Sequence, residues 1–570
     1  MGTIDHNMAR RRIEVRGHYE DRFEIKESDP SRRWDPKEKI WWFGDTALTA
    51  INIAKALPNY ERSLAFQALL PDITEDQGTG CDLNMADIPE YPFDSKTTPW
   101  QHQIEGVSLI EAREACLLFW EMGTGKTKCV VDWICNYYGD KPILIACPRT
   151  VCRVWEKEFR RHGCREAQVL ILGKSSTSRD AEDIRKMLRR AVTSPQVIVG
   201  NFERLWRGDL ATEIKSRQWA LIVADEIQRI KSPGGKASRF MSSLRGNAEK
   251  RVGLSGTPMP NGPLDAYSVF RFLDTGLFGT SFTRFRARYA VMGGFKGYEV
   301  KGYQRKEELQ ERMAIMTHRV RKDEVLDLPD IMHEELTVDL TPGTSRVYKQ
   351  METDYVADVE SGVVTASNVL SRLLRLQQIA SGFLPVEDKP VERLGTEKSD
   401  ALADLLEDLP ADEPIVVFCR FKDDLREIHR VADQVGRQSH ELSGGRRELE
   451  EWQEASSGEV LAVQIQAGGV GVDMTRARYC AYYSLGFSLG DYEQSLARIH
   501  RSGQDRKCTY YHIVARGTVD RQVYGALRDK ANVIDSVTAA LGKPSLLPVP
   551  PPPPTPEPEP LSVEATEMPF

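Results

Sequence analysis

The sequence predicts an α/β fold built from two parallel-sheet lobes, and two series of apolar runs carry that prediction. Between residues 115 and 254, strand-length runs alternate with charged stretches of helical length; the runs are ACLLFW, PILIAC, QVLIL, QVIVG, WALIVAD and RVGLSG. Strands that are apolar throughout indicate a parallel sheet covered by helices on both faces. A second series, PIVVFC, EVLAVQI, RYCAYYS and KCTYYHIV, follows from residue 414 and predicts a second lobe.

The chain of 570 residues is long enough for several cores, since an average domain has about 150 residues. Between the lobes, apolar residues recur three or four apart, as in SNVLSRLLRLQQIASGFL, which predicts a largely helical insertion. The C-terminal residues are proline-rich and acidic, which predicts a disordered tail. We therefore expect a small N-terminal module at 1–96, the first lobe at 97–277, the helical insertion and linker at 278–394, the second lobe at 395–542 and the tail at 543–570.

Composition restricts the classes of protein to consider. Hydrophobic residues make up 41% and charged residues 28%, and no apolar run approaches the roughly 20 residues that a membrane helix needs. The N-terminus lacks the apolar stretch of a secretory signal, so we expect a cytoplasmic protein that does not bind membranes. Ten cysteines without a CxxC pair are predicted to be buried thiols. The net charge of −7 confines any nucleic-acid contacts to a local groove.

A glycine-rich turn follows the run ACLLFW and leads into a helical stretch. In such a turn, glycines let backbone N–H groups approach phosphates, Lys126 adds a cation, and Thr127 offers a hydroxyl to Mg²⁺. The alternative is an unrelated glycine turn before a helix, and Trp120 stands where phosphate loops usually begin with glycine. The residues that we expect to bind ATP here are Met122, Gly123, Thr124, Gly125, Lys126 and Thr127.

Two adjacent carboxylates, Asp225 and Glu226, end the apolar strand WALIV. We expect Asp225 to hold Mg²⁺ together with Thr127, and Glu226 to orient the water that attacks the terminal phosphate. The alternative is a solvated strand end, which an acid pair without a phosphate loop would favour. The loop upstream favours the catalytic interpretation.

The second lobe contains a glycine-rich loop, QAGGVGVD, and then the segment QSLARIHRSGQ. Arg498 and Arg501 are three residues apart, so they lie on one helix face. Guanidinium groups placed in this way can reach a nucleotide on the other lobe and stabilise charge on the transferring phosphoryl group. The alternative is an exposed arginine pair that binds solvent or acids.

Taken in order, these segments resemble the motifs of the Swi/Snf-type superfamily 2 helicase-like ATPases. The matching segments are HQIEGV, EMGTGKT, CPRTVCRVWEKEF, NFE, DEIQ, LSGTP, HRVRKDEVLDLP, QAGGVGVD and QSLARIHRSGQ, between about residues 97 and 540. The resemblance implies two RecA-like lobes, ATP hydrolysis with Mg²⁺, and duplex or branched DNA as the partner.

The resemblance also implies roles for single residues. Gln103 reads adenine, Gly471 and Asp473 border the nucleotide, and Arg149 and Asn201 contact DNA. Residues that couple hydrolysis to the lobe interface are Gln228, Ser255, Gly256, Thr257 and Gln494. The group commonly has histidine where this chain has the glutamine of DEIQ, and an amide can still hydrogen-bond there.

The N-terminal stretch FEIKESDPSRRWDPKEKIWWF is similar to a short element found ahead of the motor in annealing-helicase (HARP-like) relatives, where it helps to engage branched DNA. The alternative is a small β-hairpin that packs Trp34, Trp41 and Trp42 into its own core, with Asp35 and Pro36 in the turn.

Residues 282–306 hold seven Lys or Arg against one acidic residue, with aromatic residues between them. This pattern predicts DNA binding through Arg284, Arg286 and Arg288, and its alternative is an exposed helical pair with the aromatics in its core. The proline-rich tail is a candidate contact for protein partners.

We expect a DNA-dependent ATPase that translocates on duplex DNA and remodels or anneals DNA structures. The alternatives are a strand-separating helicase or restriction-type motor, and an ATP-gated DNA-binding scaffold.

Overall fold

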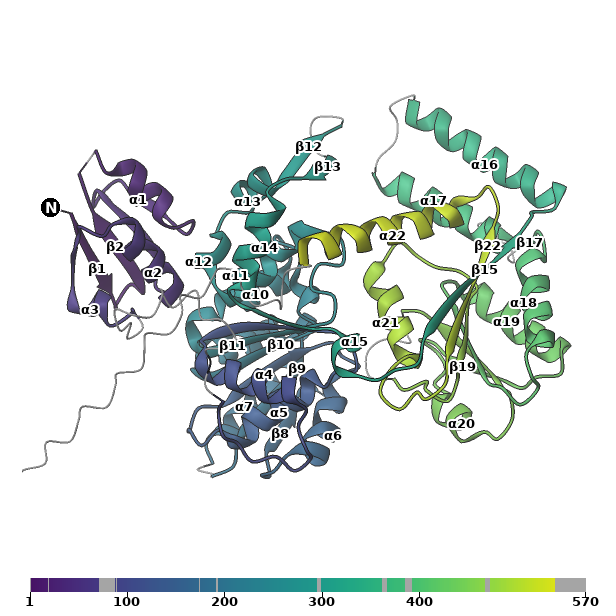
Figure 1. Cartoon of the computed structure of the whole chain (residues 1–570), viewed down its shortest axis with the longest axis horizontal. Coiled ribbons are helices and arrows are strands. Elements are labelled where there is room, and N and C mark those ends of the chain that lie inside the picture. The colour runs from purple at the N-terminus through teal and green to yellow at the C-terminus, as the bar shows by residue number, and fades with distance from the viewer. Residues whose placement is uncertain are drawn as a thin grey trace, which may run out of the picture.

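The computed structural model describes residues 2–18, 20–70, 88, 90–173, 175–190, 193–294, 299–360, 366–384, 392–466 and 472–538. An N-terminal module, a first lobe and a second lobe follow one another along the long axis of the molecule (Figure 1). The fold class predicted from the apolar runs is confirmed, because each lobe is built on its own parallel sheet. The segment predicted to be a disordered tail lies outside the described residues.

The N-terminal module is a five-stranded sheet in the order β3-β4-β2-β1-β5 with three helices. Its apolar core includes Ile4, Ile13, Val15 and Phe43. The elements are β1 (Thr3–Asn7), β2 (Arg12–Arg16), α1 (Arg22–Ser28), β3 (Arg33–Asp35), β4 (Ile40–Gly44), α2 (Ala47–Ala56), β5 (Glu61–Arg62) and α3 (Leu64–Gln67).

Strands β3 and β4 form the hairpin that was the alternative for this segment, with Trp34 opposite Trp41. The three tryptophans do not share one core. Trp34 is 48% exposed, whereas Trp41 is partly buried and packs against the module's apolar cluster, with its ring centroid 5.0 Å from that of Trp34. The alternation of a strand explains the difference within β4, because Trp41 and Phe43 are two residues apart and share the core face, whereas Trp42 lies on the other face.

The first lobe contains a seven-stranded sheet in the order β14-β6-β11-β10-β7-β9-β8, and every neighbouring pair is parallel. Its strands are β6 (Ala115–Trp120), β7 (Ile143–Cys147), β8 (Gln168–Ile171), β9 (Gln196–Asn201), β10 (Trp219–Asp225), β11 (Ala248–Ser255) and β14 (Thr317–Val320). Helices cover both faces, each with its own apolar cluster. The helices are α4 (Gln101–Ala112), α5 (Lys126–Asn136), α6 (Cys152–His162), α7 (Thr177–Leu188), α8 (Phe202–Leu205), α9 (Gly208–Lys215), η2 (Ile227–Ile230), α10 (Lys236–Ser243), η3 (Arg245–Asn247), η4 (Pro263–Asp265), α11 (Ala266–Leu273) and α12 (Thr275–Phe278).

The second lobe contains a six-stranded parallel sheet in the order β15-β22-β21-β18-β20-β19. Its elements are β15 (Ile331–Val338), α18 (Glu397–Asp408), β18 (Ile415–Cys419), α19 (Lys422–Gln434), β19 (Ser439–Leu442), α20 (Leu449–Glu454), β20 (Val460–Gln464), β21 (Tyr479–Tyr482), α21 (Leu489–Ile499), β22 (Cys508–Ala515) and α22 (Val519–Thr538). Because the strands of each sheet are parallel, the loops that follow them lie side by side along one edge of that sheet.

The segment between the lobes is helical in α13 (Phe282–Tyr289), α14 (Lys306–Ala314), α16 (Pro342–Glu360) and α17 (Ala366–Ala380). It also contains two short hairpins, β12 (Ala290–Gly293) with β13 (Glu299–Tyr303), and β16 (Phe383–Leu384) with β17 (Glu392–Arg393). The expectation of a largely helical insertion missed that β14 joins the first sheet and β15 the second. Both are edge strands with mixed polar sequences, THRV and IMHEELTV, so they lack the apolar run of a central strand.

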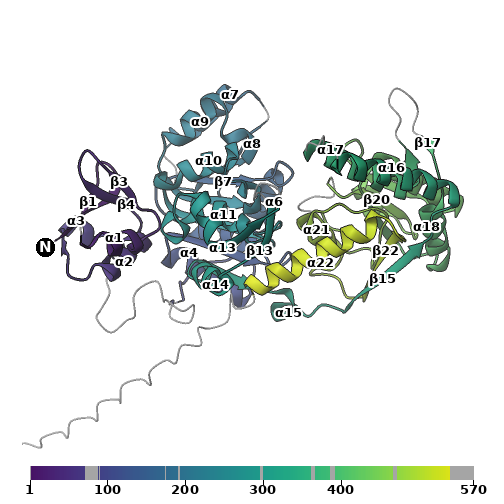
Figure 2. The same cartoon turned by 90° about the horizontal axis from the view of Figure 1, so that it is seen from above.

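Two elements span the lobes. The chain crosses from the first sheet to the second through β14, α15 (Lys322–Val325) and β15. Helix α22 then returns from the second lobe and packs on α14 of the first, as Figure 2 shows from above. Among the described residues, no helix is both long and apolar enough to cross a membrane. Cys164 is the exposed cysteine of the described set, and the others in it are buried.

Candidate nucleotide site between the lobes

The predicted phosphate loop joins the end of β6 to the start of α5. Gly123 and Gly125 have φ angles of 90° and 85°, which is the left-handed region that glycine enters without strain. A Cβ on Gly125 would collide with the amide of Gln103. The loop therefore has the tight course that lets backbone N–H groups at the start of α5 face a phosphate.

Helix α4 holds this loop from one side. Gln103 Nε2 donates to the Thr124 carbonyl at 3.1 Å, and His102 Nε2 lies 2.8 Å from the same oxygen. Gln103 Oε1 in turn accepts from the backbone N–H of Trp100 at 3.0 Å. The residue expected to read adenine thus lies directly against the phosphate loop.

Trp120, which replaces the usual first glycine, is fully buried at the end of β6. Its indole N–H donates to His318 Nδ1 at 3.2 Å, and its ring lies edge-on to His102 with centroids 4.9 Å apart. Burial lowers the pKa of His318 to about 4, so its ring is neutral and able to accept this bond. The chain is still a strand at this position, so a large side chain packs into the core without entering the loop.

Lys126 is the first residue of α5. Its Nζ donates to the carbonyls of Trp120 at 2.7 Å and Glu121 at 3.1 Å. Burial lowers the pKa of Lys126, while the carboxylates of Glu226 and Asp225 act in the opposite direction. The amine is therefore a buried cation, held by the loop's own carbonyls and within electrostatic range of the acid pair.

The acid pair lies where β10 ends, with both side chains buried. Asp225 Oδ2 accepts a hydrogen bond from the indole N–H of Trp155 at 3.0 Å. Burial, together with the charge of the neighbouring Glu226, raises the pKa of Asp225 to about 7. Glu226 has a φ of 53°, a left-handed conformation that non-glycine residues adopt at a cost of about 1–3 kcal/mol and that is concentrated at functional sites.

A chain of hydrogen bonds leads from Glu226 toward the second lobe. Gln228 Nε2 donates to Glu226 Oε2 at 2.6 Å, and Gln228 Oε1 accepts from the Ser255 hydroxyl at 2.8 Å. The Ser255 hydroxyl also accepts from the backbone N–H of Thr257 at 2.9 Å. An amide both donates and accepts, so the glutamine of DEIQ joins the acid to the end of β11.

The last link crosses the lobe interface. Thr257 Oγ1 donates to Glu493 Oε2 on α21 at 2.5 Å. The contact is made by Glu493, the neighbour of the expected coupling residue Gln494. Gly256 lies against the phosphate loop, since a Cβ there would be 3.3 Å from Met122 Cγ.

The two predicted arginines extend from the second lobe to the nucleotide site. Arg498 is 5% exposed, and its Nε and Nη2 have no hydrogen-bond partner among the described residues. Burial lowers the pKa of Arg498 to about 10, although the negative charge of Glu226 acts to raise it. Arg501 lies against the phosphate loop, because a Cβ built on Gly123 would be 3.6 Å from Arg501 Cβ. Within the second lobe, Arg501 Nη1 donates to the Val472 carbonyl at 3.4 Å.

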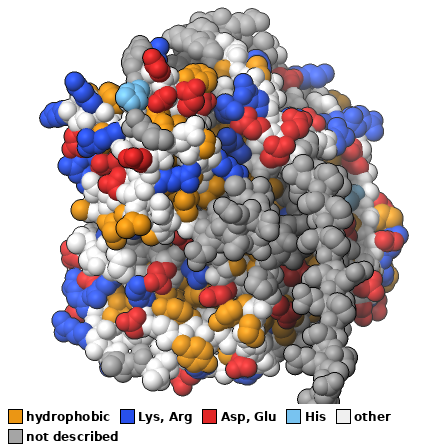
Figure 3. All heavy atoms as spheres, turned by 60° about the vertical axis from the view of Figure 1, so that its left-hand side comes forward, with side chains coloured by type: hydrophobic (Ala, Val, Ile, Leu, Met, Phe, Trp, Pro, Cys, Tyr) orange, Lys and Arg blue, Asp and Glu red, His pale blue; other side chains and the backbone are white. Residues whose placement is uncertain are grey.

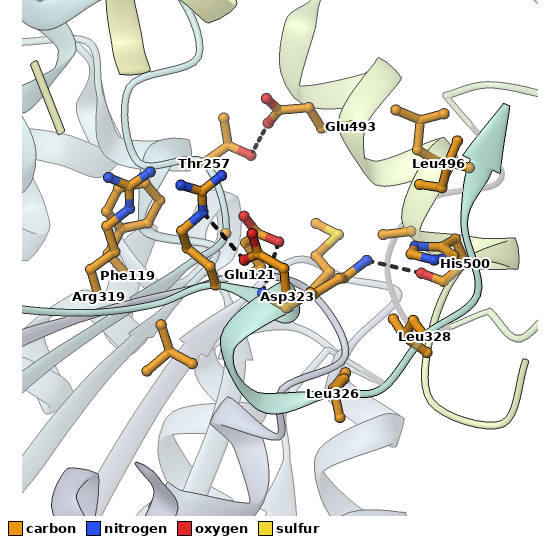
Figure 4. Close-up of a pocket in the computed structure, with 17 residues that line it drawn as sticks. Phe119, Glu121, Thr257, Arg319, Asp323, Leu326, Leu328, Glu493, Leu496 and His500 are labelled. Atoms are coloured by element: carbon orange, nitrogen blue, oxygen red, sulfur yellow. Dashed lines mark hydrogen bonds and ion pairs between the residues drawn. The ribbon is translucent and has the colours of Figure 1, made fainter. Parts of the chain in front are cut away.

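The linker helix α15 contacts both sides of this site. The backbone N–H of Lys322 donates to Glu121 Oε2 at 3.1 Å, and Lys322 Nζ donates to the carbonyl of His500 at 2.9 Å. His500 Nε2 lies 2.8 Å from the Pro329 carbonyl. Burial lowers the pKa of Lys322 to about 8. A pocket of about 420 Å³ lies between the lobes here, with Thr257 and Glu493 on its wall (Figure 4).

The expected DNA contacts Arg149 and Asn201 share a second pocket, of about 400 Å³, at the edge of the first sheet. Its lining also includes Arg204 and Arg207, which motif reasoning did not single out. Asn201 Oδ1 accepts from the backbone N–H of Arg204 at 2.9 Å, so it caps α8 and fixes the pocket's wall.

The basic stretch after residue 281 begins with α13, whose aromatic residues Phe285 and Tyr289 are buried in the first lobe's core. Arg288 pairs with Glu308, Nη2 to Oε2 at 2.7 Å, whereas Arg284 remains exposed and Arg286 partly exposed. Of the other expected site residues, Asp473 accepts from the Thr475 backbone N–H at 2.9 Å, and Gly471 lies outside the described residues.

Two family models match the chain. The SNF2-related domain covers residues 102–382, and the helicase conserved C-terminal domain covers residues 397–503. The chain belongs to the Swi/Snf-type helicase-like ATPases. The family predicted from the motifs is thus confirmed, and the SNF2-related and helicase C-terminal models fall on the lobes that carry the site.

Relatives of this Swi/Snf-type chain come from several organisms. An uncharacterized ATP-dependent helicase of Mycoplasma genitalium is 24% identical over 453 residues, covering 76% of this chain and 42% of that protein. A SWI/SNF-related matrix-associated actin-dependent regulator of chromatin subfamily A-like protein 1 homolog of Caenorhabditis elegans is 24% identical over 542 residues, covering 89% of this chain and 72% of that protein.

Among solved structures, the Sulfolobus solfataricus SWI2/SNF2 ATPase core in complex with dsDNA is 22% identical, with a TM-score of 0.38, covering 79% of this chain and 95% of that one. The chain spans less than half the length of the Mycoplasma and Bacillus subtilis relatives that it matches.

Proposed function

We propose that this chain is a DNA-dependent ATPase that translocates on duplex DNA. The observation that carries the proposal is Arg498, a buried guanidinium of the second lobe with two nitrogens that lack a hydrogen-bond partner among the described residues. A buried cation of this kind is costly unless an anion is bound beside it. Charges from both lobes meet here, since Glu226 and Arg498 act on the pKa of Lys126, and Glu226 also acts on the pKa of Arg498. An anion between the lobes, namely the phosphates of ATP, fits this arrangement.

The proposed roles follow from the chemistry of each group. The amine of Lys126 neutralises the terminal phosphates, and Gln103 hydrogen-bonds the adenine. Glu226 orients the attacking water, while Arg498 and Arg501 stabilise charge that develops on the phosphoryl group.

Asp225 and the hydroxyl of Thr127 are the hard oxygen donors that fit Mg²⁺. The burial of Asp225 beside a second carboxylate, Glu226, supports this assignment, because two adjacent buried carboxylates are stabilised when a cation binds between them and the phosphates. When bound, the ion neutralises charge on the phosphate oxygens. The carboxylate stays aligned for this role because Trp155 holds its other oxygen.

Coupling of hydrolysis to lobe closure is proposed to pass through Gln228, Ser255 and Thr257 to Glu493. The supporting evidence is their unbroken series of hydrogen bonds from Glu226 to the second lobe. Lobe closure brings the arginines to the phosphates and, through the same series, fixes the carboxylate that orients water.

DNA is proposed to bind along the first lobe at the pocket of Arg149, Asn201, Arg204 and Arg207. The acidic net charge of −7 supports contacts confined to such a place. Figure 3 shows one face of the molecule on which Lys and Arg alternate with Asp and Glu, without a single basic field.

We also propose that residues 1–96 form an accessory module that engages branched DNA. The exposed Trp34 ring lies beside that of Trp41 at a tilt of 48°. The Lys26 cation lies 5.6 Å from the Trp41 ring centroid, and the Arg33 cation lies 5.0 Å from that of Trp42. Aromatic faces with adjacent cations bind nucleic acid through stacking and phosphate contacts. The module is fixed to the first lobe by a hydrogen bond from Thr46 Oγ1 to Asp274 Oδ1, at 2.9 Å.

The testing experiment measures ATP hydrolysis without DNA and with single-stranded, duplex and forked DNA, with a Lys126→Ala variant as the blank. We expect duplex DNA to stimulate turnover, and the variant to be inactive but folded. Triplex displacement by the wild-type protein on the same duplex would demonstrate translocation. Stimulation by single-stranded DNA with duplex inert would instead favour a strand-separating helicase, and turnover insensitive to all DNA would contradict the proposal.

A further inference from the structure

Trp155 connects two parts of the first lobe that the proposed function assigns to different ligands. It lies in the first turn of α6, its indole is fully buried, and its N–H donates to Asp225 Oδ2. Strands β7 and β10 are parallel neighbours, with Ala146 opposite Ala224. The loop after β7 and the carboxylate at the end of β10 therefore meet at one edge of the sheet.

The other end of this connection is the four-residue loop 148–151 between β7 and α6. Arg149 in this loop is exposed and lines the proposed DNA pocket. The Val151 carbonyl accepts from the backbone N–H of Trp155 at 3.2 Å, and the Pro148 carbonyl accepts from that of Val151 at 2.9 Å. Because backbone hydrogen bonds join the loop to the first turn of α6, a shift of the loop moves the indole.

We propose that Trp155 is a positioning residue that orients the Asp225 carboxylate and transmits DNA binding at loop 148–151 to it. This inference rests on the proposed function, since it takes Asp225 as the residue that holds Mg²⁺. An indole N–H only donates, so it fixes Oδ2 and leaves Oδ1 as the oxygen that would hold Mg²⁺. No atom on this path belongs to a residue expected to touch the nucleotide except Asp225 itself.

The test replaces Trp155 with Phe, which keeps a buried aromatic ring and removes the donor. A fluorescent non-hydrolysable ATP analogue is titrated onto the whole chain with and without Mg²⁺, and turnover is measured with and without duplex DNA. We expect the apparent Mg²⁺ dissociation constant for analogue binding to rise about tenfold, because a hydrogen bond to a charged group is lost. Binding without Mg²⁺ should not change, and the ratio of DNA-stimulated to basal turnover should fall.

Trp219→Phe is the matched control. Trp219 is also fully buried in the first lobe, and its indole N–H donates to the Ile214 carbonyl at 3.1 Å, away from the acid pair. It should lose comparable stability without altering the Mg²⁺ dependence. Because Trp155→Phe removes ring volume, a second protein carries benzothienylalanine at residue 155, which keeps the bicyclic ring and replaces the N–H with sulfur.

The inference is overturned if both changes at residue 155 leave the Mg²⁺ dependence as it is in Trp219→Phe. Weakened Mg²⁺ dependence with an unchanged ratio of DNA-stimulated to basal turnover would overturn the transmission from loop 148–151. Failure of the proposed function looks different, since Lys126→Ala would then hydrolyse ATP in the same assay.

Discussion

The hydroxyl of Thr257 in the first lobe donates a hydrogen bond to Glu493 in the second, with 2.5 Å between Oγ1 and Oε2. This bond ends the series that starts at Glu226 and passes through Gln228 and Ser255. If the lobes rotate and break the bond to Glu493, the segment after β11 loses this restraint. Ser255, which donates to the Gln228 amide, ends β11 directly before this segment. The orientation of the buried carboxylate thus depends on whether the lobes are closed.

Thr257→Val should separate nucleotide binding from hydrolysis. The change keeps the shape of the side chain and removes the donor to Glu493, so we expect DNA-stimulated kcat to fall about tenfold while KM for ATP stays within about twofold. Steady-state kinetics on duplex DNA checks this. Thr353→Val, which removes an exposed hydroxyl bonded only within α16, is the control. A rise in KM with normal kcat would place Thr257 in substrate binding instead.

Lys126→Ala and Glu226→Gln should fail at different steps. The first removes the cation for the phosphates, so we expect loss of both turnover and tight nucleotide binding. The second keeps Lys126 and Asp225 and loses the carboxylate that orients water, so we expect ATP to bind and persist. Binding of radiolabelled ATP followed by analysis of the bound nucleotide distinguishes them. Bound ADP in Glu226→Gln would show that another group handles the water.

Arg498→Met should lower the ATPase activity and raise the stability of the folded protein. The guanidinium is buried with unpaired nitrogens, so replacing it with an apolar side chain should raise the free energy of unfolding without nucleotide by about 1 kcal/mol or more. Turnover with DNA should fall by roughly 10³, because the charge that stabilises the transition state is lost. Chemical denaturation and ATPase assays measure the two effects.

The matched control for this variant is Arg437→Met. Arg437 lies in the second lobe and donates to the carbonyls of Leu409, Pro410, Glu413 and Gly458. Its loss should lower stability and leave the rate per folded molecule unchanged. If Arg498→Met were also destabilised, Arg498 would be a structural cation and not one held ready for an anion.

The stability of the N-terminal module should depend on pH through Asp29, which accepts hydrogen bonds from Ser31 and Asn52 of the same module. Burial raises its pKa to about 7, so the folded protein keeps a proton that the unfolded chain, with a carboxyl pKa of about 3.9, has released. The free energy of unfolding should therefore decrease as pH rises from about 4 to 7. Thermal unfolding across this window should show a flatter profile for Asp29→Asn. The exposed Asp339→Asn should keep the wild-type slope.

The pocket of Arg149 and Arg207 should account for part of the salt dependence of DNA binding. Replacing each with Gln should weaken binding evenly across sequences and reduce the slope of log K against log salt by about 1. Fluorescence anisotropy at several salt concentrations measures this. Arg160→Gln is the control, because Arg160 is exposed on α6, the helix that follows loop 148–151, and pairs with Glu156. Unchanged slopes for Arg149 and Arg207 would move the DNA groove toward Arg284 and Arg286.

The parts of the site that the sequence predicts are those encoded in one short segment. Backbone conformation at Gly123 and Gly125 depends on local residue type, and the acid pair marks the end of an apolar strand. Both can be found without knowing the fold. The same holds for the central strands, whose apolar runs are continuous.

The partners of these motifs could not be found in this way. Trp155, Glu493 and Lys322 act through contacts between elements far apart in the chain. Trp155 and Lys322 lie inside segments that resemble family motifs, and Glu493 directly precedes another, but nothing in these segments shows which residues the three side chains contact. Edge strands such as β14 were missed for a related reason, since β14 is mostly buried but its sequence, THRV, mixes polar and apolar residues and so lacks an apolar run.

Helix α22 gives the molecule a second tie between its lobes, besides the β14–α15–β15 crossing. Two lobes joined by a single connection can rotate in any direction, whereas two separate connections restrict them to rotation about one axis. Each cycle of ATP should then produce the same hinge motion in the same plane, and under the proposed translocation this would favour movement along DNA with a fixed polarity. Cutting the chain within α22 should leave ATP chemistry possible and make the stroke directionless.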